Sequence, residues 1–163
     1  MGDPRRFNAL ADLAVVTFPE HRGNAVADVA GGKGGLKAAL YLRGWHNVTT
    51  IDKRHRLAKS RSGQRYARFT PSFHERFSLV LSMHPDEATD NAVLYAARWR
   101  VPFIVVPCCV KPDAAPYAGR PGDKSDWIRH VARLADRTHV VETRVLPISG
   151  DAVALVGVPR RMI

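Results

Sequence analysis

The sequence predicts an α/β protein with a seven-stranded, mostly parallel sheet, helices on both faces and a C-terminal antiparallel hairpin. Short apolar or β-branched runs alternate with segments of helical periodicity along most of the 163 residues. This alternation is typical of parallel sheets whose crossover connections are helices. Near the end of the chain, two apolar runs flank the turn sequence Ser-Gly-Asp, which predicts the hairpin. At this length we expect a single domain, residues 1–163.

The first half of the chain supplies two helices and three strands. Residues 7–17 place apolar side chains at helical spacing, and residues 24–30 form an apolar strand run. Residues 33–43 gather apolar side chains on one helical face before a glycine that predicts the end of the helix. Residues 47–52 are β-branched and short, which predicts a second strand. A basic segment then leads to a weak third strand near residues 66–69.

The second half continues the alternation and ends in the hairpin. Residues 77–82 are a buried-strand run, and residues 86–100 predict a helix whose acidic first turn suits the helix dipole. Residues 101–107 are another apolar strand, followed by a long loop rich in Pro, Gly and Asp, a type that is often functional. Ser125 is the expected N-cap of a helix that reaches Asp136. The runs "THVVETRVLPI" and "AVALVGV" are the hairpin strands.

Composition is that of an ordinary globular protein, with 45% apolar and 25% charged residues. No apolar run approaches the roughly 20 residues of a membrane span, and no signal-peptide core follows the basic N-terminus. We therefore expect a cytoplasmic protein without membrane association.

The chain is strongly basic, and this predicts a polyanionic partner. The net charge is +10, carried mostly by arginine, which favours RNA or DNA; the alternative is that genome composition has enriched arginine. Residues 53–68 contain seven Lys or Arg and no acid, so they are candidates for phosphate binding, with a solvated basic face as the alternative. Tyr66 and Phe69 at the edge of this run are candidates for base stacking.

A glycine-rich loop follows the first predicted strand, in the run "DVAGGKGGL". It does not fit a P-loop, because Ala27 stands at the first required glycine and Gly34 follows Lys33 where Ser or Thr is needed. It does not fit the dinucleotide pattern Gly-x-Gly-x-x-Gly either, because the last glycine of that pattern falls on Lys37. Two common phosphate-binding loops are thus excluded.

A third pattern does fit: an acid followed by glycines at alternate positions, as in S-adenosylmethionine sites. Asp28, Ala30, Gly32 and Gly34 match it, with alanine at the first glycine position. The two glycines allow close backbone approach and positive φ, and an acid at a strand end can serve the ligand's ammonium group. Asp52 ends the second strand, where an acid is expected to accept hydrogen bonds from a ribose diol; a simple turn residue is the alternative.

Together with the terminal hairpin, these features resemble the class I S-adenosylmethionine-dependent methyltransferases, whose sheet is Rossmann-like. The resemblance covers nearly the whole chain. The runs "DVAGGKGGL", "MHPDEATDNAV" and "VPCCV" further resemble, in order, segments of the eukaryotic tRNA ribose 2′-O-methyltransferases and of related methyltransferase-like proteins. The interval from His84 to Thr89 is one residue shorter than in the tRNA enzymes, and their zinc-binding modules are absent from the sequence. No acid follows the third strand, where many class I enzymes contact adenine.

The resemblance implies S-adenosyl-L-methionine as the cofactor and RNA, either tRNA or rRNA, as the substrate. Two alternatives stay open: a catalytically silent RNA-binding or ribosome-assembly protein, and a methyltransferase for a protein or small molecule. A nicotinamide-dependent reductase is a more distant alternative. Because the chain is little more than a catalytic core, a homodimer or a partner subunit is expected to assist substrate recognition.

The predicted site residues gather at strand ends. His84 and Asp86 follow the fourth strand, toward which the reactive methyl points in class I folds; they are the predicted catalytic residues, with an inert loop residue and a helix start as alternatives. Asp90 beyond them is expected to be solvated. Cys108 and Cys109 are expected to be reduced wall residues, and no Cys or His spacing predicts a metal site. The predicted cofactor-binding residues are Asp28, Ala30, Gly31, Gly32, Lys33, Gly34, Asp52, Lys53 and Ser82.

Overall fold

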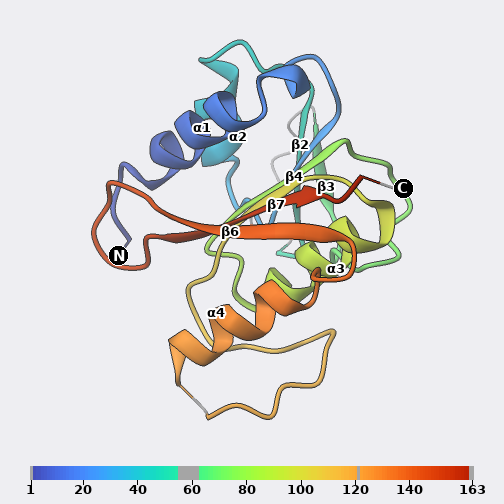
Figure 1. The fold of residues 1–163 in the computed structure, drawn as a ribbon. Coiled ribbons are helices and arrows are strands. Elements are labelled where there is room, and N and C mark those ends of the chain that lie inside the picture. Colours follow the sequence, from blue (N-terminus) through green and yellow to red (C-terminus); the bar gives the residue numbers. More distant parts are fainter. Residues whose placement is uncertain (1, 55–62, 121, 162–163) are drawn as a thin grey trace.

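The computed structural model describes residues 2–54, 63–120 and 122–161, and these form one seven-stranded sheet with the order β3-β2-β1-β4-β5-β7-β6 (Figure 1). Strands β1 to β5 run parallel, whereas β7 is antiparallel to both β5 and β6. The predicted mostly parallel sheet with a C-terminal hairpin is therefore confirmed. The strands are β1 Val26–Val29, β2 Val48–Asp52, β3 Gln64–Tyr66, β4 Leu79–Met83, β5 Phe103–Val106, β6 His139–Val145 and β7 Val153–Pro159.

Two helical layers cover the sheet, one on each face (Figure 1). Helices α1 (Arg6–Thr17) and α2 (Gly35–Tyr41) pack on one face, and α3 (Thr89–Trp99) and α4 (Lys124–Arg133) pack on the other. Two apolar clusters fill the two interfaces. Neighbouring residues of β1 enter different clusters, Val26 the first and Ala27 the second, because successive strand side chains point to opposite faces. None of the helices in the described ranges combines the length and the apolar character that a bilayer crossing requires.

The order of the strands reverses between β1 and β4, and this creates the crevice in which open α/β sheets bind ligands. The chain passes outward from β1 to β2 and β3, and then returns to place β4 on the other side of β1. Ser82 fastens the two central strands together, because its buried hydroxyl donates a 2.6 Å hydrogen bond to the Val29 carbonyl. The loops after β1, β2 and β4 therefore meet at one edge of the sheet.

Several element boundaries differ from the prediction. The third strand is Gln64–Tyr66, because its pairing with β2 begins at Gln64, and Phe69 instead enters the core. The predicted helix over residues 86–100 begins as a short 3-10 turn, Asp86–Ala88, and becomes α-helical at Thr89.

The cap of α4 also differs from the prediction, since Asp123 and not Ser125 occupies that position. The Asp123 carboxylate accepts the Asp126 N–H at 3.0 Å, which satisfies one of the unpaired donors of the first turn. The two residue types serve equally well as caps, so the choice between them depends on where the preceding loop ends. Half of the predicted basic segment 53–68, namely residues 55–62, lies outside the described residues.

Candidate functional site

The loop after β1 adopts a left-handed backbone conformation at three alternate residues. The φ angles are 53° at Ala30, 57° at Gly32 and 80° at Gly34. These are the three glycine positions of the predicted acid-x-Gly-x-Gly-x-Gly pattern. The loop has that backbone course even at Ala30, where a side chain in the left-handed region costs about 1–2 kcal/mol.

Asp28 supports this loop from beneath. Its side chain is buried and accepts a 3.0 Å hydrogen bond from the Thr50 hydroxyl, and burial raises the pKa of the carboxyl to about 7. A Cβ at Gly31 would stand 2.2 Å from Asp28 Oδ2, so only glycine can lie above this carboxyl group. In this structure the predicted acid therefore shapes the loop and offers almost no surface to a ligand.

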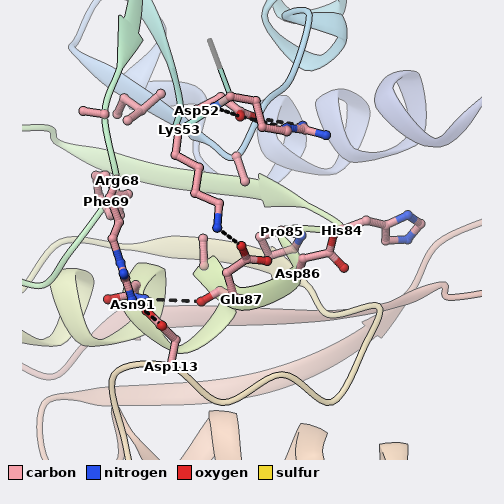
Figure 2. A pocket seen from close by; sticks show the side chains of 15 residues that line it. Asp52, Lys53, Arg68, Phe69, His84, Pro85, Asp86, Glu87, Asn91 and Asp113 are labelled. Atoms are coloured by element: carbon pink, nitrogen blue, oxygen red, sulfur yellow. Dashed lines mark hydrogen bonds and ion pairs between the residues drawn. The ribbon is translucent and has the colours of Figure 1, made fainter. Parts of the chain in front are cut away.

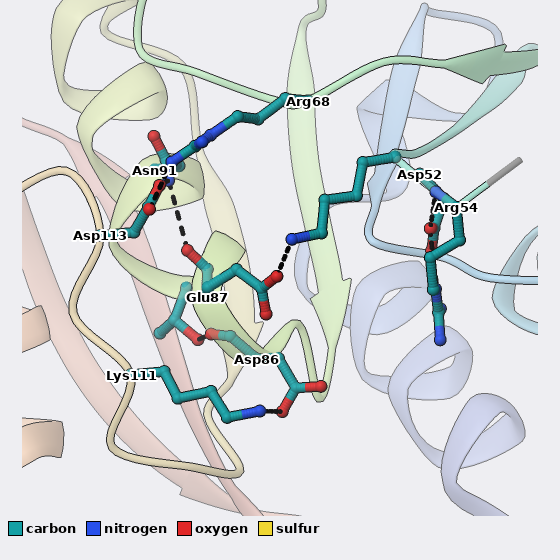
Figure 3. Close-up of polar contacts among 10 residues, drawn as sticks. Asp52, Arg54, Arg68, Asp86, Glu87, Asn91, Lys111 and Asp113 are labelled. Carbon is teal, nitrogen blue, oxygen red and sulfur yellow. Dashed lines mark hydrogen bonds and ion pairs between the residues drawn. The ribbon is translucent and has the colours of Figure 1, made fainter.

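Asp52 connects the loop to the end of β2. Its Oδ2 accepts the Gly32 N–H at 2.9 Å, and Arg54 pairs with both carboxylate oxygens at 2.8–2.9 Å (Figure 3). Burial acts to raise the pKa of Asp52, but the hydrogen bonds from Arg54 and Gly32 outweigh it and hold the pKa below its ordinary value. Asp52 is thus an ionised acceptor at the predicted ribose position, and Arg54 covers it.

A cavity of about 220 Å³ lies between the ends of β2 and β4 (Figure 2). Five of the predicted site residues line it together with residues that follow β3. Lys33 and Gly34 line a separate apolar groove beside Tyr41 and Leu42. Asp28, Gly31, Gly32 and Ser82 are not among the lining residues of the cavity. The five that line it are Ala30, Asp52, Lys53, His84 and Asp86.

No protein-family model matches the sequence, and no curated protein matches it. Many solved structures do match. A sugar N-methyltransferase from a Streptoalloteichus species is 11% identical with a TM-score of 0.60, covering 96% of this chain and 87% of its own. The magnesium protoporphyrin IX methyltransferase of Synechocystis, solved with bound S-adenosylmethionine, is 15% identical with a TM-score of 0.59, covering 97% and 79%. A glycopeptide N-methyltransferase complexed with S-adenosylhomocysteine is 14% identical with a TM-score of 0.61, covering 96% and 90%.

The chain has the class I methyltransferase fold. At these identities the likeness establishes the fold alone. The strand order by itself indicates ligand binding at the edge where the loop after β1 and the ends of β2 and β4 meet.

In this methyltransferase fold, four ion pairs surround the cavity (Figure 3). Lys53 pairs with Glu87 and so joins the end of β2 to the end of β4. Because both of its side chains are exposed, this pair contributes little, about 0–1 kcal/mol, so an entering ligand displaces it at small cost. The cavity therefore presents both signs of charge. The other three pairs are Arg54–Asp52, Arg68–Asp113 and Lys111–Asp86.

Asp90 organises the wall of the crevice, and the expectation that it is solvated is wrong. It is fully buried, and its Oδ2 accepts three backbone N–H groups, from Asp113, Ala114 and Ala115, at 2.7–3.1 Å. The long loop after β5 folds back onto the start of α3, and this contact buries Asp90. Sequence reasoning missed it because the loop contributes only backbone donors, which no residue type reveals. It also left out Glu87, Asn91 and Asp113, which line the cavity together with Arg68 of the predicted basic run and Phe69, a predicted stacking residue.

His84 and Asp86 follow β4 as predicted, both with positive φ, 54° and 52°. The His84 ring turns away from the Lys53–Glu87 pair (Figure 2), and its Nε2 donates a 2.9 Å hydrogen bond to the Asp151 carbonyl. A carbonyl has no proton to donate, so Nε2 carries the proton and Nδ1 carries the lone pair in the neutral ring. His84 thus belongs to the cavity wall and also fastens the β6–β7 turn.

Asp86 contacts the two cysteines, which follow β5. The Cys108 thiol donates to Asp86 Oδ1 at 3.4 Å, and Lys111 Nζ lies 3.2 Å from the same oxygen. Burial acts to raise the pKa of Asp86, but Lys111 and the two thiols outweigh it and lower the pKa. Burial raises the pKa of the Cys108 thiol to about 12, so it is protonated at neutral pH and unsuited to act as a nucleophile.

Proposed function

We propose that the protein is an S-adenosylmethionine-dependent methyltransferase. The observation that carries this proposal is the glycine loop, left-handed at Ala30, Gly32 and Gly34 and connected through the Gly32 N–H to Asp52. A loop rich in glycine allows close approach of a nucleoside, and an ionised acid beside it suits the two hydroxyls of a ribose. The matching folds solved with S-adenosylmethionine or S-adenosylhomocysteine support the same cofactor.

The residues around the cavity suit a transfer in which the protein aligns the reactants. The bound cofactor would supply an activated methyl group, which passes from sulfur to the acceptor as the sulfur–carbon bond breaks. The acceptor, if a hydroxyl, loses its proton, and His84 Nδ1 is the proposed recipient because Nε2 already carries a proton. Asp52 would fix the ribose, and Glu87 and Asn91 of the cavity wall would contact the acceptor.

Calorimetry with S-adenosylhomocysteine tests the cofactor, with NAD as the matched control ligand. We expect saturable binding of the first and none of the second, because the dinucleotide glycine pattern ends on Lys37 in this chain. Binding of NAD alone, or of neither nucleotide, contradicts the proposal.

For the substrate we propose RNA, supported by the net charge of +10 and by the acid-free basic run that borders the cavity at Lys53, Arg54 and Arg68. Affinity for structured RNA should fall linearly on a log–log plot against salt. Changing Arg56, Arg61 and Arg65 to Glu should abolish binding; Arg54 is left unchanged because it holds Asp52. The control reverses the same amount of charge on α4 and in the turn after it, at Arg129, Arg133 and Arg137. Equal loss in both variants would mean that charge alone, and not this segment, controls binding.

A small-molecule acceptor is the second candidate, favoured by the matched enzymes, whose names describe a sugar, a glycopeptide and a porphyrin as substrates. The two candidates separate on labelled methyl transfer into total RNA compared with the small-metabolite fraction of a cell extract. Cofactor binding without transfer into either fraction would indicate a catalytically silent fold.

A further inference from the structure

Three metal-ligating side chains meet where β4 and β5 end. The thiols of Cys108 and Cys109 and a carboxylate oxygen of Asp86 all lie within 4.8 Å of one another, and each residue is partly buried. Among the residues that the structure describes, this is the one group of three or more His, Cys, Asp or Glu with donor atoms so close. Through Asp86 the trio adjoins the cavity that Asp52 also lines, but none of the hydrogen bonds of Asp52 involves a member of the trio.

The sheet itself brings these residues together. Met83 pairs with Val106, and the His84 N–H donates to the Val106 carbonyl at 3.0 Å, which holds the two strand ends in register. The positive φ of Asp86 turns the chain sharply after Pro85. The bend at Cys109 interrupts the extended course, so the two adjacent thiols need not point to opposite sides, as they would within a strand. The three side chains therefore follow the ends of two hydrogen-bonded strands.

We propose that Asp86, Cys108 and Cys109 bind one divalent metal ion of the zinc type. Two sulfurs and one oxygen form a soft donor set that selects zinc over magnesium or calcium. In a tetrahedral zinc site, bonds of about 2.3 Å to sulfur and about 2.0 Å to oxygen place neighbouring donors roughly 3.5 Å apart. Cys108 Sγ and Asp86 Oδ1 already stand at 3.4 Å, and Cys109 Sγ lies within 4.8 Å of both donor atoms.

Binding needs two local changes. The two thiols release their protons to solvent as the metal–sulfur bonds form. Lys111 leaves Asp86, and this costs little because its side chain is about half exposed and lies on a loop. With three protein ligands, the fourth position stays open to water or another small ligand, which is the arrangement of zinc sites that exchange ligands.

Cobalt provides a sharp test, because zinc is spectroscopically silent and the whole chain contains only two cysteines. The untagged, reduced protein is stripped with a chelator and titrated with Co²⁺ alone. We expect one equivalent to produce a sulfur-to-cobalt charge-transfer band in the near ultraviolet, displaced by Zn²⁺. Such a band can come only from Cys108 and Cys109. Its absence overturns the proposal.

Variants and thiol protection complete the test. Zn²⁺ affinity, measured by competition with a chromophoric chelator, should fall by at least about 100-fold in Cys108→Ser, Cys109→Ser and Asp86→Asn, more than the loss of an outer-shell partner costs. Asp126→Asn on α4 is the control, expected to bind as the wild type does. In the wild type alone, Zn²⁺ should slow alkylation of both cysteines, as followed by mass spectrometry. Unchanged alkylation, or undiminished affinity in the double cysteine variant, contradicts the site even where a single variant fails to fold.

Discussion

The backbone N–H of Gly32 donates a 2.9 Å hydrogen bond to Asp52 Oδ2, and this bond joins the glycine loop to the end of the neighbouring strand. The position of the loop and the charge state of Asp52 therefore depend on each other. Arg54 occupies the remaining faces of the carboxylate, so a ribose that binds there must replace its guanidinium.

Asp52→Ala should weaken binding of S-adenosylhomocysteine about 10- to 150-fold, because a hydrogen bond to a charged group contributes about 1.5–3 kcal/mol. Arg54→Ala should act in the opposite direction, since the ligand no longer displaces a side chain. Isothermal titration of the two variants measures both changes in affinity, with Asp12→Asn, an exposed side chain on α1, as the control. Unchanged affinity in Asp52→Ala would exclude the residue from the site.

Gly31→Ala should destabilise the protein, because the new Cβ would stand 2.2 Å from a carboxylate oxygen of buried Asp28. Overpacking of this kind typically costs about 1–3 kcal/mol. Gly23→Ala is the matched control, since a Cβ there meets nothing within 4 Å. Urea unfolding of the two variants measures the difference, and equal midpoints would contradict the close contact.

Asp28 should make the protein less stable as pH rises. Its folded pKa is raised to about 7 by burial, above its unfolded value of 3.8. The folded state therefore binds more protons than the unfolded state between these values, and stability declines through that window by up to ~1.4 kcal/mol per pH unit. Asp28→Asn removes this contribution and keeps an acceptor for Thr50. Urea unfolding from pH 4.5 to 7.5 measures the free energy of unfolding of both proteins. The wild-type value minus the variant value should fall as pH rises.

Asp90→Asn should loosen the loop after β5. The carboxylate accepts the N–H groups of residues 113 to 115 through Oδ2 and that of Asn91 through Oδ1, and an amide cannot accept at both atoms. We expect faster hydrogen exchange at residues 113–115 and a loss of about 1–3 kcal/mol for an unsatisfied buried donor. Exchange in the buried strand β1, at the centre of the sheet, is the internal reference, and an equal increase there would indicate global unfolding.

His84→Ala should lower the rate of methyl transfer by about 10²–10⁴ if Nδ1 takes the proton of the acceptor. His84→Gln separates this role from a structural one, because its amide can still donate to the Asp151 carbonyl but cannot accept a proton. Single-turnover kinetics should therefore find methyl transfer slow in both variants. Thermal unfolding should find a lower melting temperature in His84→Ala alone. A Gln variant as fast as the wild type would leave His84 only the structural hydrogen bond.

The sequence allowed most of the architecture to be predicted, because alternating apolar runs and helical periodicity determine a layered sheet. The loop conformation could also be predicted from the sequence, because the alternate residues Ala30, Gly32 and Gly34 fit a pattern of glycines that adopt positive φ. Contacts between distant segments were not. The burial of Asp90 depends on how the long loop folds back, and the contact of Asp86 with Cys108 depends on how two strand ends meet. Hydrophobic periodicity predicts local structure and does not predict such contacts.

The order of the last two strands has a consequence for how the chain folds during synthesis. Strand β7 lies between β5 and β6, so β6 leaves the ribosome first but has no place in the sheet until β7 follows. Until then β6 has no partner strand, and the edge of β5 is open to pairing with any other extended segment. During synthesis, the segments N-terminal to β6 should therefore become protected from protease earlier than β6 itself. A translational pause between β6 and β7 should prolong an aggregation-prone intermediate.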